Sequence, residues 1–482
     1  MTTPTTVRTE FVRAISRLDA TALVVGSMIG SGIFIVSADI LRQVQTPGLL
    51  LLVWAVSGVV TLMGALAYGE LAAMFPNAGG QYVYLREGIS PLFGYLYGWT
   101  LFTVIQTGTI AAVAVAFARF TAVFVPALSP DVFLGTTINL GSGPIQVGLS
   151  PQRIFAVLSV IILTWINVRG VRTAAVIQTT LTVIKTAALA GLIVLGITIG
   201  RNAEATPANF GPNFWPAGGL TLGLLPLVGA AMVGSLFSMD AWNNVGFASG
   251  ELKDPKRDLP FAMATGVLVV TVLYLLANVA YLNVLPADAI AHAPQDRVGT
   301  AALQAMLGGP GLYIMAAAIM ISTFGCNNGL ILSGARVYYA MARDNLFFKS
   351  TGVLHPTYKT PALALVVQAI WTCVLCLSGT YGELLNYVIF AALLFYMLTA
   401  VGLFLLRSRR PTAERPVKAM LYPWLPALYV IATGLLCVNL LIQPAQQRYA
   451  GLGLIIVAIG VPVYYGWRRW VSPPPVGTPT SQ

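Results

Sequence analysis

Two polar interruptions inside otherwise apolar stretches contain the residues of this sequence best suited to chemistry. The first covers residues 26–34, GSMIGSGIF, with three glycines and two serines. Glycines weaken a helix and can leave its N–H and C=O groups bare. The second covers residues 237–244, FSMDAWNN, with the Asp240 carboxylate and two amides. An acid in the middle of a membrane helix costs about 2.5–3.5 kcal/mol, so both stretches predict a binding site.

Lys185 is the third candidate, a single cation within the apolar stretch 174–199. It lies about 11 residues from either end of that stretch, too deep for its ammonium to reach water by snorkelling. A lysine at such a depth is by default a hypothesis about function. A structural role, in which the ammonium only bonds backbone carbonyls, stays open as the alternative.

The composition indicates which elements position these residues. The chain has 482 residues, of which 57% are hydrophobic and only 9% charged, and its mean hydropathy is +0.79. Soluble domains are about one quarter charged, so an ordinary soluble enzyme, a disordered chain and a collagen-like chain are excluded. No hydrophilic stretch is long enough for a separate soluble domain. We predict an all-α polytopic membrane protein.

Apolar stretches of about 20 residues are the unit of a membrane span, and hydropathy predicts twelve of them. They lie near residues 18–40, 48–75, 92–124, 152–168, 174–199, 219–248, 260–286, 310–340, 361–378, 383–406, 422–442 and 449–467.

The net charge of +11 is explained by the distribution of Lys and Arg between the two sides of the predicted membrane spans. A cytoplasmic N-terminus places 20 of the 27 Lys and Arg residues on the cytoplasmic side, against five on the other (Arg42, Arg153, Arg201, Arg297 and Arg448). This bias predicts that both termini are cytoplasmic. The charge therefore does not indicate nucleic-acid binding. Because the polar N-terminus precedes a long first span, we expect no cleaved signal peptide.

Cysteines and histidines predict no cofactor or metal site. The four cysteines (Cys326, Cys373, Cys376 and Cys437) all fall within predicted spans, where small buried packing residues are the simplest interpretation. The two histidines fall in loops on opposite sides.

The two polar interruptions lie in the first and sixth predicted spans, five helices apart. Interrupted helices at corresponding positions of two halves indicate a transporter built from inverted repeats. Helix packing through small residues is the alternative for either stretch alone.

These residues also carry a family resemblance. GSMIGSGIF resembles the substrate-binding segment of the amino acid–polyamine–organocation (APC) superfamily, and FSMDAWNN resembles its L-type amino-acid transporter branch, including bacterial members. Further matches follow in the same order along nearly the whole chain: Tyr68-Gly69-Glu70-Leu71, Asn167-Val168-Arg169-Gly170-Val171, Ala277-Asn278-Val279-Ala280-Tyr281, Ser322-Thr323-Phe324-Gly325 and Arg407 through Pro411.

The resemblance implies the LeuT-type fold, with ten helices in two inverted five-helix repeats and two extra C-terminal helices. The single transport domain would span residues 1–482, with repeats at about 18–199 and 219–406 and the extra helices at about 422–467. Helices 1 and 6 of the twelve would be broken, and residues 1–17 and 471–482 would be cytoplasmic tails.

The resemblance also implies how an amino-acid substrate binds. Backbone N–H groups around Ser31 and Gly32, at the start of a half-helix, would hold the carboxylate. The glycines, Gly30 included, would let the ligand approach the backbone. An aromatic, Phe237, would close over the substrate, while Trp242 and Asn243 would shape the side-chain pocket. The ammonium would be held by the carbonyls of Met28, Ile29, Phe237, Ser238 and Asp240.

Asp240 leaves three interpretations open. Its carboxylate could pair with a cationic substrate side chain. It could equally belong to a carrier of small neutral amino acids, because bacterial exchangers of such substrates resemble this chain here too. As a structural residue, it could cap the broken helix or hydrogen-bond a neighbour. Met239 and Ala241 depart from the aromatic and glycine usual in the family. The extra methyl of Ala241 favours small to medium neutral amino acids.

For Lys185, the resemblance implies that its ammonium replaces the sodium ion of sodium-coupled relatives. Its partners would be the carbonyls of Gly26 and Ile29 and the hydroxyls of Ser322 and Thr323. We therefore expect sodium-independent transport. Burial also disfavours the charged form of a lysine, so proton-coupled uptake through Lys185 is the second hypothesis.

The expected function is exchange of amino acids by alternating access in a bacterial inner membrane. An ion channel lacks support because no filter-like repeat occurs, and an intramembrane enzyme would need a nucleophile–base pair or metal ligands at membrane depth. No cysteine lies between the third and fourth spans, where eukaryotic relatives bind a heavy chain through a disulfide, so no such partner is expected. We interpret Glu70 as structural, bonded to loop amides or to a cytoplasmic arginine.

Overall fold

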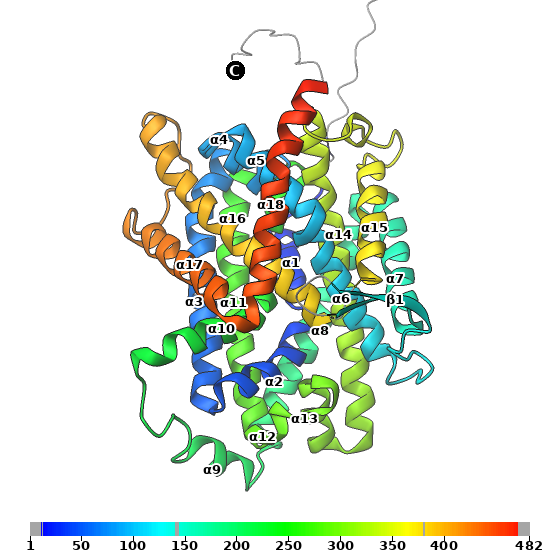
Figure 1. Cartoon of the computed structure of the whole chain (residues 1–482), viewed down its shortest axis with the longest axis vertical. Helices are drawn as coiled ribbons and strands as arrows, with labels where there is room; N and C mark the ends of the chain where they lie inside the picture. The colour runs from blue at the N-terminus through cyan, green and yellow to red at the C-terminus, as the bar shows by residue number, and fades with distance from the viewer. Residues whose placement is uncertain (1–10, 12, 140–143, 379–380, 471–482) are drawn as a thin grey trace, which may run out of the picture.

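The structure of the chain is a computed structural model, which describes residues 11, 13–139, 144–378 and 381–470. The helices run mostly along the long axis of the molecule, with α9, α12 and α13 at one end and α4 at the other (Figure 1). The α-helices are α1 (Arg17–Met28), α2 (Gly32–Val44), α3 (Pro47–Met74), α4 (Gln81–Gly88), α5 (Pro91–Thr100), α6 (Gln106–Thr121), α7 (Pro151–Val168), α8 (Val171–Thr198), α9 (Ala205–Phe210), α10 (Leu225–Ser238), α11 (Pro255–Val284), α12 (Ala287–Ala291), α13 (Val298–Leu307), α14 (Gly309–Arg343), α15 (Ala362–Cys376), α16 (Tyr381–Arg409), α17 (Trp424–Ile442) and α18 (Pro444–Trp470).

Shorter elements complete the chain. A π-helix, Leu101–Ile105, joins α5 to α6. Turns of 3-10 helix lie at Leu222–Leu224, Asn244–Gly246, Ser249–Glu251, Pro294–Asp296 and Lys349–Gly352. The expected tails at 1–17 and 471–482 fall largely outside the described residues.

Local sequence explains where several helices begin. α1 starts after Ser16, whose hydroxyl accepts from the Asp19 N–H at 3.2 Å while the Asp19 carboxylate accepts from the Ser16 N–H at 3.1 Å, a complete capping box. α3 begins with Pro47 and α7 with Pro151, a residue that suits the first helical turn because its missing N–H would be unpaired there.

Within the described ranges, ten helices are long and apolar enough to cross a membrane, with α1–α2 and α5–α6 each counted as one. They coincide with ten of the predicted spans. Shorter apolar helices at 222–238 and 362–376 lie at the positions of the other two. The chain is thus a helical membrane protein that crosses the bilayer several times.

One expectation needs correction. The all-α expectation missed a two-stranded antiparallel hairpin, β1 (Leu134–Asn139) and β2 (Pro144–Leu149), paired from Leu134↔Leu149 to Asn139↔Pro144. Its β-branched residues favour strands, but its segments are too short to register in a search for spans. Within the predicted span 219–248, α10 ends at Ser238 and 3-10 turns follow, which is the position of the polar interruption at 237–244.

The first span is the most deeply enclosed. In the apolar window of Arg17–Val44, 89% of the residues are buried, compared with 22% for Gln446–Arg469. α1 packs against α8, α11 and α14, while α2 packs against α10. The glycine-rich stretch therefore lies at the centre of the bundle, surrounded by helices that are distant in sequence.

Candidate functional site

The two polar interruptions lie directly against each other. α1 ends at Met28, Ile29 has an extended backbone (φ −72°, ψ 92°), and α2 begins at Gly32. α10 ends at Ser238. A Cβ on Gly32 would overlap the Ser238 hydroxyl and lie 3.0 Å from the Ser238 Cα atom. Only glycine permits this approach, so Gly32 brings the two interruptions together.

A small cavity lies where these interruptions meet. Seven predicted site residues line it: Met28, Gly30, Ser31, Gly32, Phe237, Ser238 and Asp240. The lining also contains residues that were not among the predicted site residues: Ser27, Thr109, Val113, Ala241 and Cys326. The cavity has room for little more than a water molecule. An amino acid would enter only if the lining moved apart.

The carbonyl groups at the end of α1 all accept hydrogen bonds from side chains of other helices. The last carbonyls of a helix have no partner within it, and in a membrane such groups must be satisfied by protein. Lys185 donates to Gly26 and Ile29, Cys326 to Ser27, Tyr274 to Met28, and Ser322 to Ile29 and Gly30. Three helices, α8, α11 and α14, thus stabilise the interruption.

Lys185 contacts part of its expected set of partners. Its ammonium, on a side chain only 1% exposed, donates to the carbonyl of Gly26 and, at 2.7 Å, to that of Ile29. It lies 3.3 Å from the backbone carbonyl of Ser322, whereas the expected partner was the hydroxyl. The Thr323 hydroxyl instead donates within its own helix, to Ile319 at 2.9 Å. The two hydroxyls bond different groups because the Ser322 side chain faces the carbonyls at the end of α1, whereas that of Thr323 does not.

Tyr274 of α11 links the two interruptions and was not predicted as a site residue. Its hydroxyl lies 2.9 Å from the Met28 carbonyl and 3.2 Å from the Ser238 carbonyl. Because a hydroxyl has one proton, it donates fully to only one of these carbonyls at a time. An ammonium group could therefore donate to the other.

Asp240 lies between the small cavity and a second one. Its carboxylate accepts a hydrogen bond from the Tyr396 hydroxyl of α16. The second cavity, beyond Asp240, is lined by aromatic and apolar residues that include Trp242, Tyr396 and Tyr429. Trp242 packs edge-on against Tyr68, with ring centroids 4.8 Å apart. Trp242 thus lies in this second compartment and does not line the first.

Asn243 and Ile29 also lie outside the lining of the small cavity. The Asn243 amide donates to Gln81 of α4 at 2.6 Å, and its oxygen lies 3.3 Å from the Tyr396 hydroxyl. Gln81 in turn donates to Thr399 at 3.0 Å. These contacts connect the chain after α10 to α4 and α16, which is a positioning role.

The backbone explains the glycine usual at position 241 in the family. Ala241 has φ +67°, in the left-handed region that costs a non-glycine residue roughly 1–2 kcal/mol. Ala241 also lines the small cavity. This departure from the family pattern therefore adds both strain and bulk at the site.

The arrangement suits a small zwitterion. The Phe34 N–H in the first turn of α2 donates to the Ser31 carbonyl at 3.1 Å, but the first N–H groups of a helix in general lack carbonyl partners within it. The positive end of the helix dipole also favours an anion such as a carboxylate. The carbonyls of Met28 and Ser238 face the same region and suit an ammonium. Among the described residues, no group of three or more His, Cys, Asp or Glu side chains could hold a metal ion.

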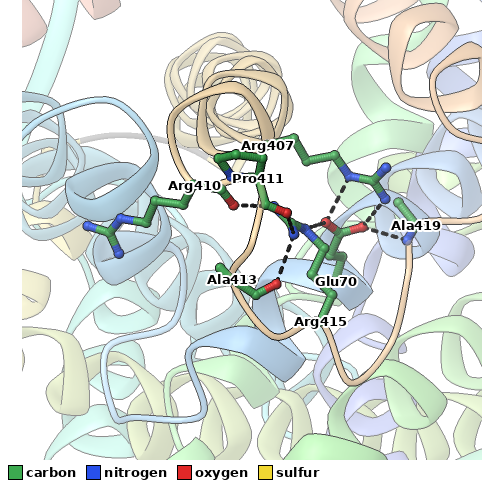
Figure 2. A network of polar contacts seen from close by, with 7 residues as sticks. All are labelled: Glu70, Arg407, Arg410, Pro411, Ala413, Arg415 and Ala419. Carbon is green, nitrogen blue, oxygen red and sulfur yellow. Dashed lines mark hydrogen bonds and ion pairs between the residues drawn. The ribbon is translucent and has the colours of Figure 1, made fainter.

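Glu70 lies apart from this site, in a polar cluster at the end of α3 (Figure 2). Its fully buried carboxylate accepts from Arg407 at 2.9 and 2.5 Å, from Arg415 at 3.1 Å and from the Ala419 N–H at 2.7 Å. Arg415 also donates to carbonyls in residues 410–413. As expected, Glu70 bonds arginines and a loop amide, and it holds the segment after α16 against α3.

Comparison with known proteins shows the family of the chain. Residues 15–464 match the family model "Amino acid permease". The chain is 32% identical to the human large neutral amino acids transporter small subunit 2 over 470 residues, which cover 96% of this chain and 82% of the relative. It is 30% identical to the serine/threonine exchanger SteT of Bacillus subtilis, covering 95% and 97%. The mouse Asc-type amino acid transporter 1 is 31% identical, covering 97% and 83%.

Proposed function

The chain belongs to the amino acid permease family, and we propose that it is a sodium-independent exchanger of small to medium neutral L-amino acids. One relative is named as a serine/threonine exchanger and another as a transporter of large neutral amino acids. The small cavity lined by glycines and Ala241 favours the smaller substrates.

The observation that carries this proposal is the contact between Gly32 and Ser238. It places the start of α2 beside the end of α10, so that N–H donors and carbonyl acceptors surround one small cavity. Those groups complement the carboxylate and ammonium that all amino acids share. Substrate contacts with both interruptions would couple binding to the relative movement of the two helices, and thus to alternating access.

The proposed architecture is the LeuT-type fold. It has twelve spans, two inverted repeats at about 18–199 and 219–406, and two extra helices at about 422–467. The first span would be broken between α1 and α2, and the sixth after α10. These features are supported by the position of the helix ends at Met28, Gly32 and Ser238.

Sodium independence rests on Lys185. Its ammonium occupies the position between α8, the end of α1 and α14 in which a cation would bond the carbonyls of Gly26, Ile29 and Ser322. A fixed positive charge there makes a bound sodium ion unnecessary. The same burial supports a second candidate function, proton-coupled uptake in which Lys185 gives up and regains its proton.

Asp240 supports a variant of the proposal in which cationic amino acids are also carried. Its buried carboxylate borders both cavities, and a cationic side chain could pair with it. The Tyr396 hydroxyl already bonds this carboxylate, which favours neutral substrates.

We further propose that the protein resides in a bacterial inner membrane with both termini in the cytoplasm, and that it works without a disulfide-linked heavy chain. The positive-inside bias supports the orientation. All four cysteines lie at or after position 326, beyond the segment between the third and fourth spans. Neither a cofactor nor catalysis is part of the proposal.

Uptake into proteoliposomes tests these alternatives. Radiolabelled L-serine, L-leucine and L-arginine are offered to vesicles with or without internal amino acid, in sodium or choline and at two pH values. Uptake that requires internal amino acid and is equal in both salts supports the exchanger. Uptake into empty vesicles driven by external acid would replace it with proton-coupled transport, and preferred uptake of L-arginine would replace the neutral substrate class.

A further inference from the structure

Two cavities are lined by residues of α1. The first is the small cavity at the Met28 end, to which Ser27 contributes. The second lies near the start of α1, lined by Ile15, Asp19 and Leu23 together with Ala175, Gln178 and Leu332. By the predicted topology, the second cavity is on the cytoplasmic side. Ser27 thus borders one cavity and Gln178 the other.

A chain of buried amides fixes the orientation of Gln178. The Leu163 carbonyl can only accept, so the Asn167 amide nitrogen must face it, at 2.9 Å. That nitrogen also donates to the Asn328 oxygen at 3.0 Å. The Asn328 nitrogen therefore faces Ala174 and the Gln178 oxygen, at 3.1 and 3.0 Å. Gln178 must then direct its own nitrogen, Nε2, toward α1.

Gln178 Nε2 and the Ser27 hydroxyl are both buried and have no hydrogen-bond partner among the residues that the structure describes. Both atoms face Gly329 of α14, which has no side chain. A Cβ on Gly329 would lie 3.0 Å from Gln178 Nε2 and 2.6 Å from Ser27 Oγ. Buried polar groups without partners are rare in native proteins, so these donors indicate a ligand that binds in another state of the cycle.

We propose that Gln178 and Ser27 form a second carboxylate-binding position, which receives the substrate between the central cavity and the cytoplasm. This inference rests on the proposed function. The two N–H groups of the amide and the serine hydroxyl can donate to a carboxylate, whereas the amide nitrogen offers nothing to an ammonium. Lys185 lies seven residues further along α8 and so on the same helix face, where its charge also favours an anion.

The packing of α1 explains why this position is closed in the structure. A Cβ on Gly26 would overlap both Gln178 Nε2 and Thr182 Oγ1, so α1 lies directly on the amide. The Thr182 hydroxyl, on the same face of α8, donates to the Ala22 carbonyl of α1 at 3.2 Å. Movement of α1 away from α8 would open the donors to both cavities at once.

The test is Gln178→Glu, which keeps the shape and the oxygen that accepts from Asn328 but replaces the N–H donors with a second oxygen. L-serine exchange is measured in inside-out and right-side-out membrane vesicles, so that each face of the transporter is studied separately. We expect the KM at the cytoplasmic face to rise about tenfold, equivalent to the loss of one good hydrogen bond. The KM at the outer face should change less than about twofold.

Gln368→Glu is the matched control, because Gln368 is equally buried and bonds the Ile331 carbonyl of α14 from α15, away from both cavities. It should leave the ratio of the two KM values as in the wild type. A Gln178→Glu variant that exchanges L-serine with an unchanged ratio would overturn the inference. Wild-type vesicles without exchange would overturn the proposed function itself.

Gly329→Ala provides an independent answer if Gln178→Glu does not fold. Its methyl group would fill the spot between Ser27 and Gln178 without adding charge. The KM should again rise at the cytoplasmic face alone, while Gly191→Ala, whose Cβ would meet nothing within 4 Å, should match the wild type. An equal change at both faces would contradict the proposed position.

Discussion

The Lys185 ammonium lies 2.7 Å from the carbonyl oxygen of Ile29, in the short segment where α1 has ended and α2 has not begun. It also bonds the Gly26 carbonyl, one turn earlier. A single side chain of α8 thus satisfies carbonyls on both sides of the last turn of α1. The stability of the interruption and the position of the substrate site therefore depend on the same group.

Replacement of Lys185 by methionine should reduce L-serine exchange at least about tenfold. The Gly26 carbonyl loses its side-chain donor and the Ile29 carbonyl keeps only Ser322, and a buried carbonyl left without a donor costs roughly 1–3 kcal/mol. The measurement is exchange in proteoliposomes at matched protein levels. Lys349→Met, which removes an exposed lysine, is the control for loss of charge. Full exchange by Lys185→Met would refute the role of this lysine.

Tyr274→Phe tests the link between the two interruptions. Loss of the hydroxyl leaves the carbonyls of Met28 and Ser238 without their shared donor, so we expect a KM for L-serine about fivefold higher and a stability lower by about 1 kcal/mol. Tyr281→Phe is the control, since its hydroxyl makes a longer bond, 3.3 Å, to Ile33 within α2. Equal effects of both substitutions would show that the link has no special role.

Sequence alone located the stretches at which α1 and α10 end, because glycines and polar side chains in an apolar helix are a local signal. Most residues that line the small cavity come from these two stretches. The apolar pattern also located the long helices. The short hairpin β1–β2 escaped because its segments are neither long nor strongly apolar.

The remaining site residues depend on packing between distant helices. Thr109, Cys326 and Tyr274 are ordinary residues in apolar helices, and nothing near them in sequence distinguishes them. Their roles depend on how α6, α14 and α11 are oriented about their own axes, because that orientation decides which side chains face the site. The same orientation decides that the Ser322 hydroxyl faces α1 while that of Thr323 bonds its own helix.

Ala241→Gly should stabilise the protein and widen its substrate range. Glycine relieves the positive φ of +67°, and the gain of up to about 1 kcal/mol is reduced by the greater freedom of glycine in the unfolded chain. Removal of the methyl group also enlarges the small cavity. Thermal unfolding should therefore shift upward, and uptake of L-leucine relative to L-alanine should increase. A lower unfolding temperature with unchanged selectivity would contradict both expectations.

Glu70→Gln should affect stability far more than transport. The substitution removes the charge that two arginines share and leaves Arg407 and Arg415 facing a neutral amide, and hydrogen bonds to charged groups contribute about 1.5–3 kcal/mol each. The cluster lies at the end of α3 (Figure 2) and contributes no residue to the small cavity. The unfolding temperature should fall while the KM for L-serine in the folded fraction stays within about twofold of the wild type.

Glu414→Gln, at a carboxylate that is 82% exposed, is the matched control and should change neither quantity. A large rise in KM without loss of stability would instead place Glu70 in the transport cycle.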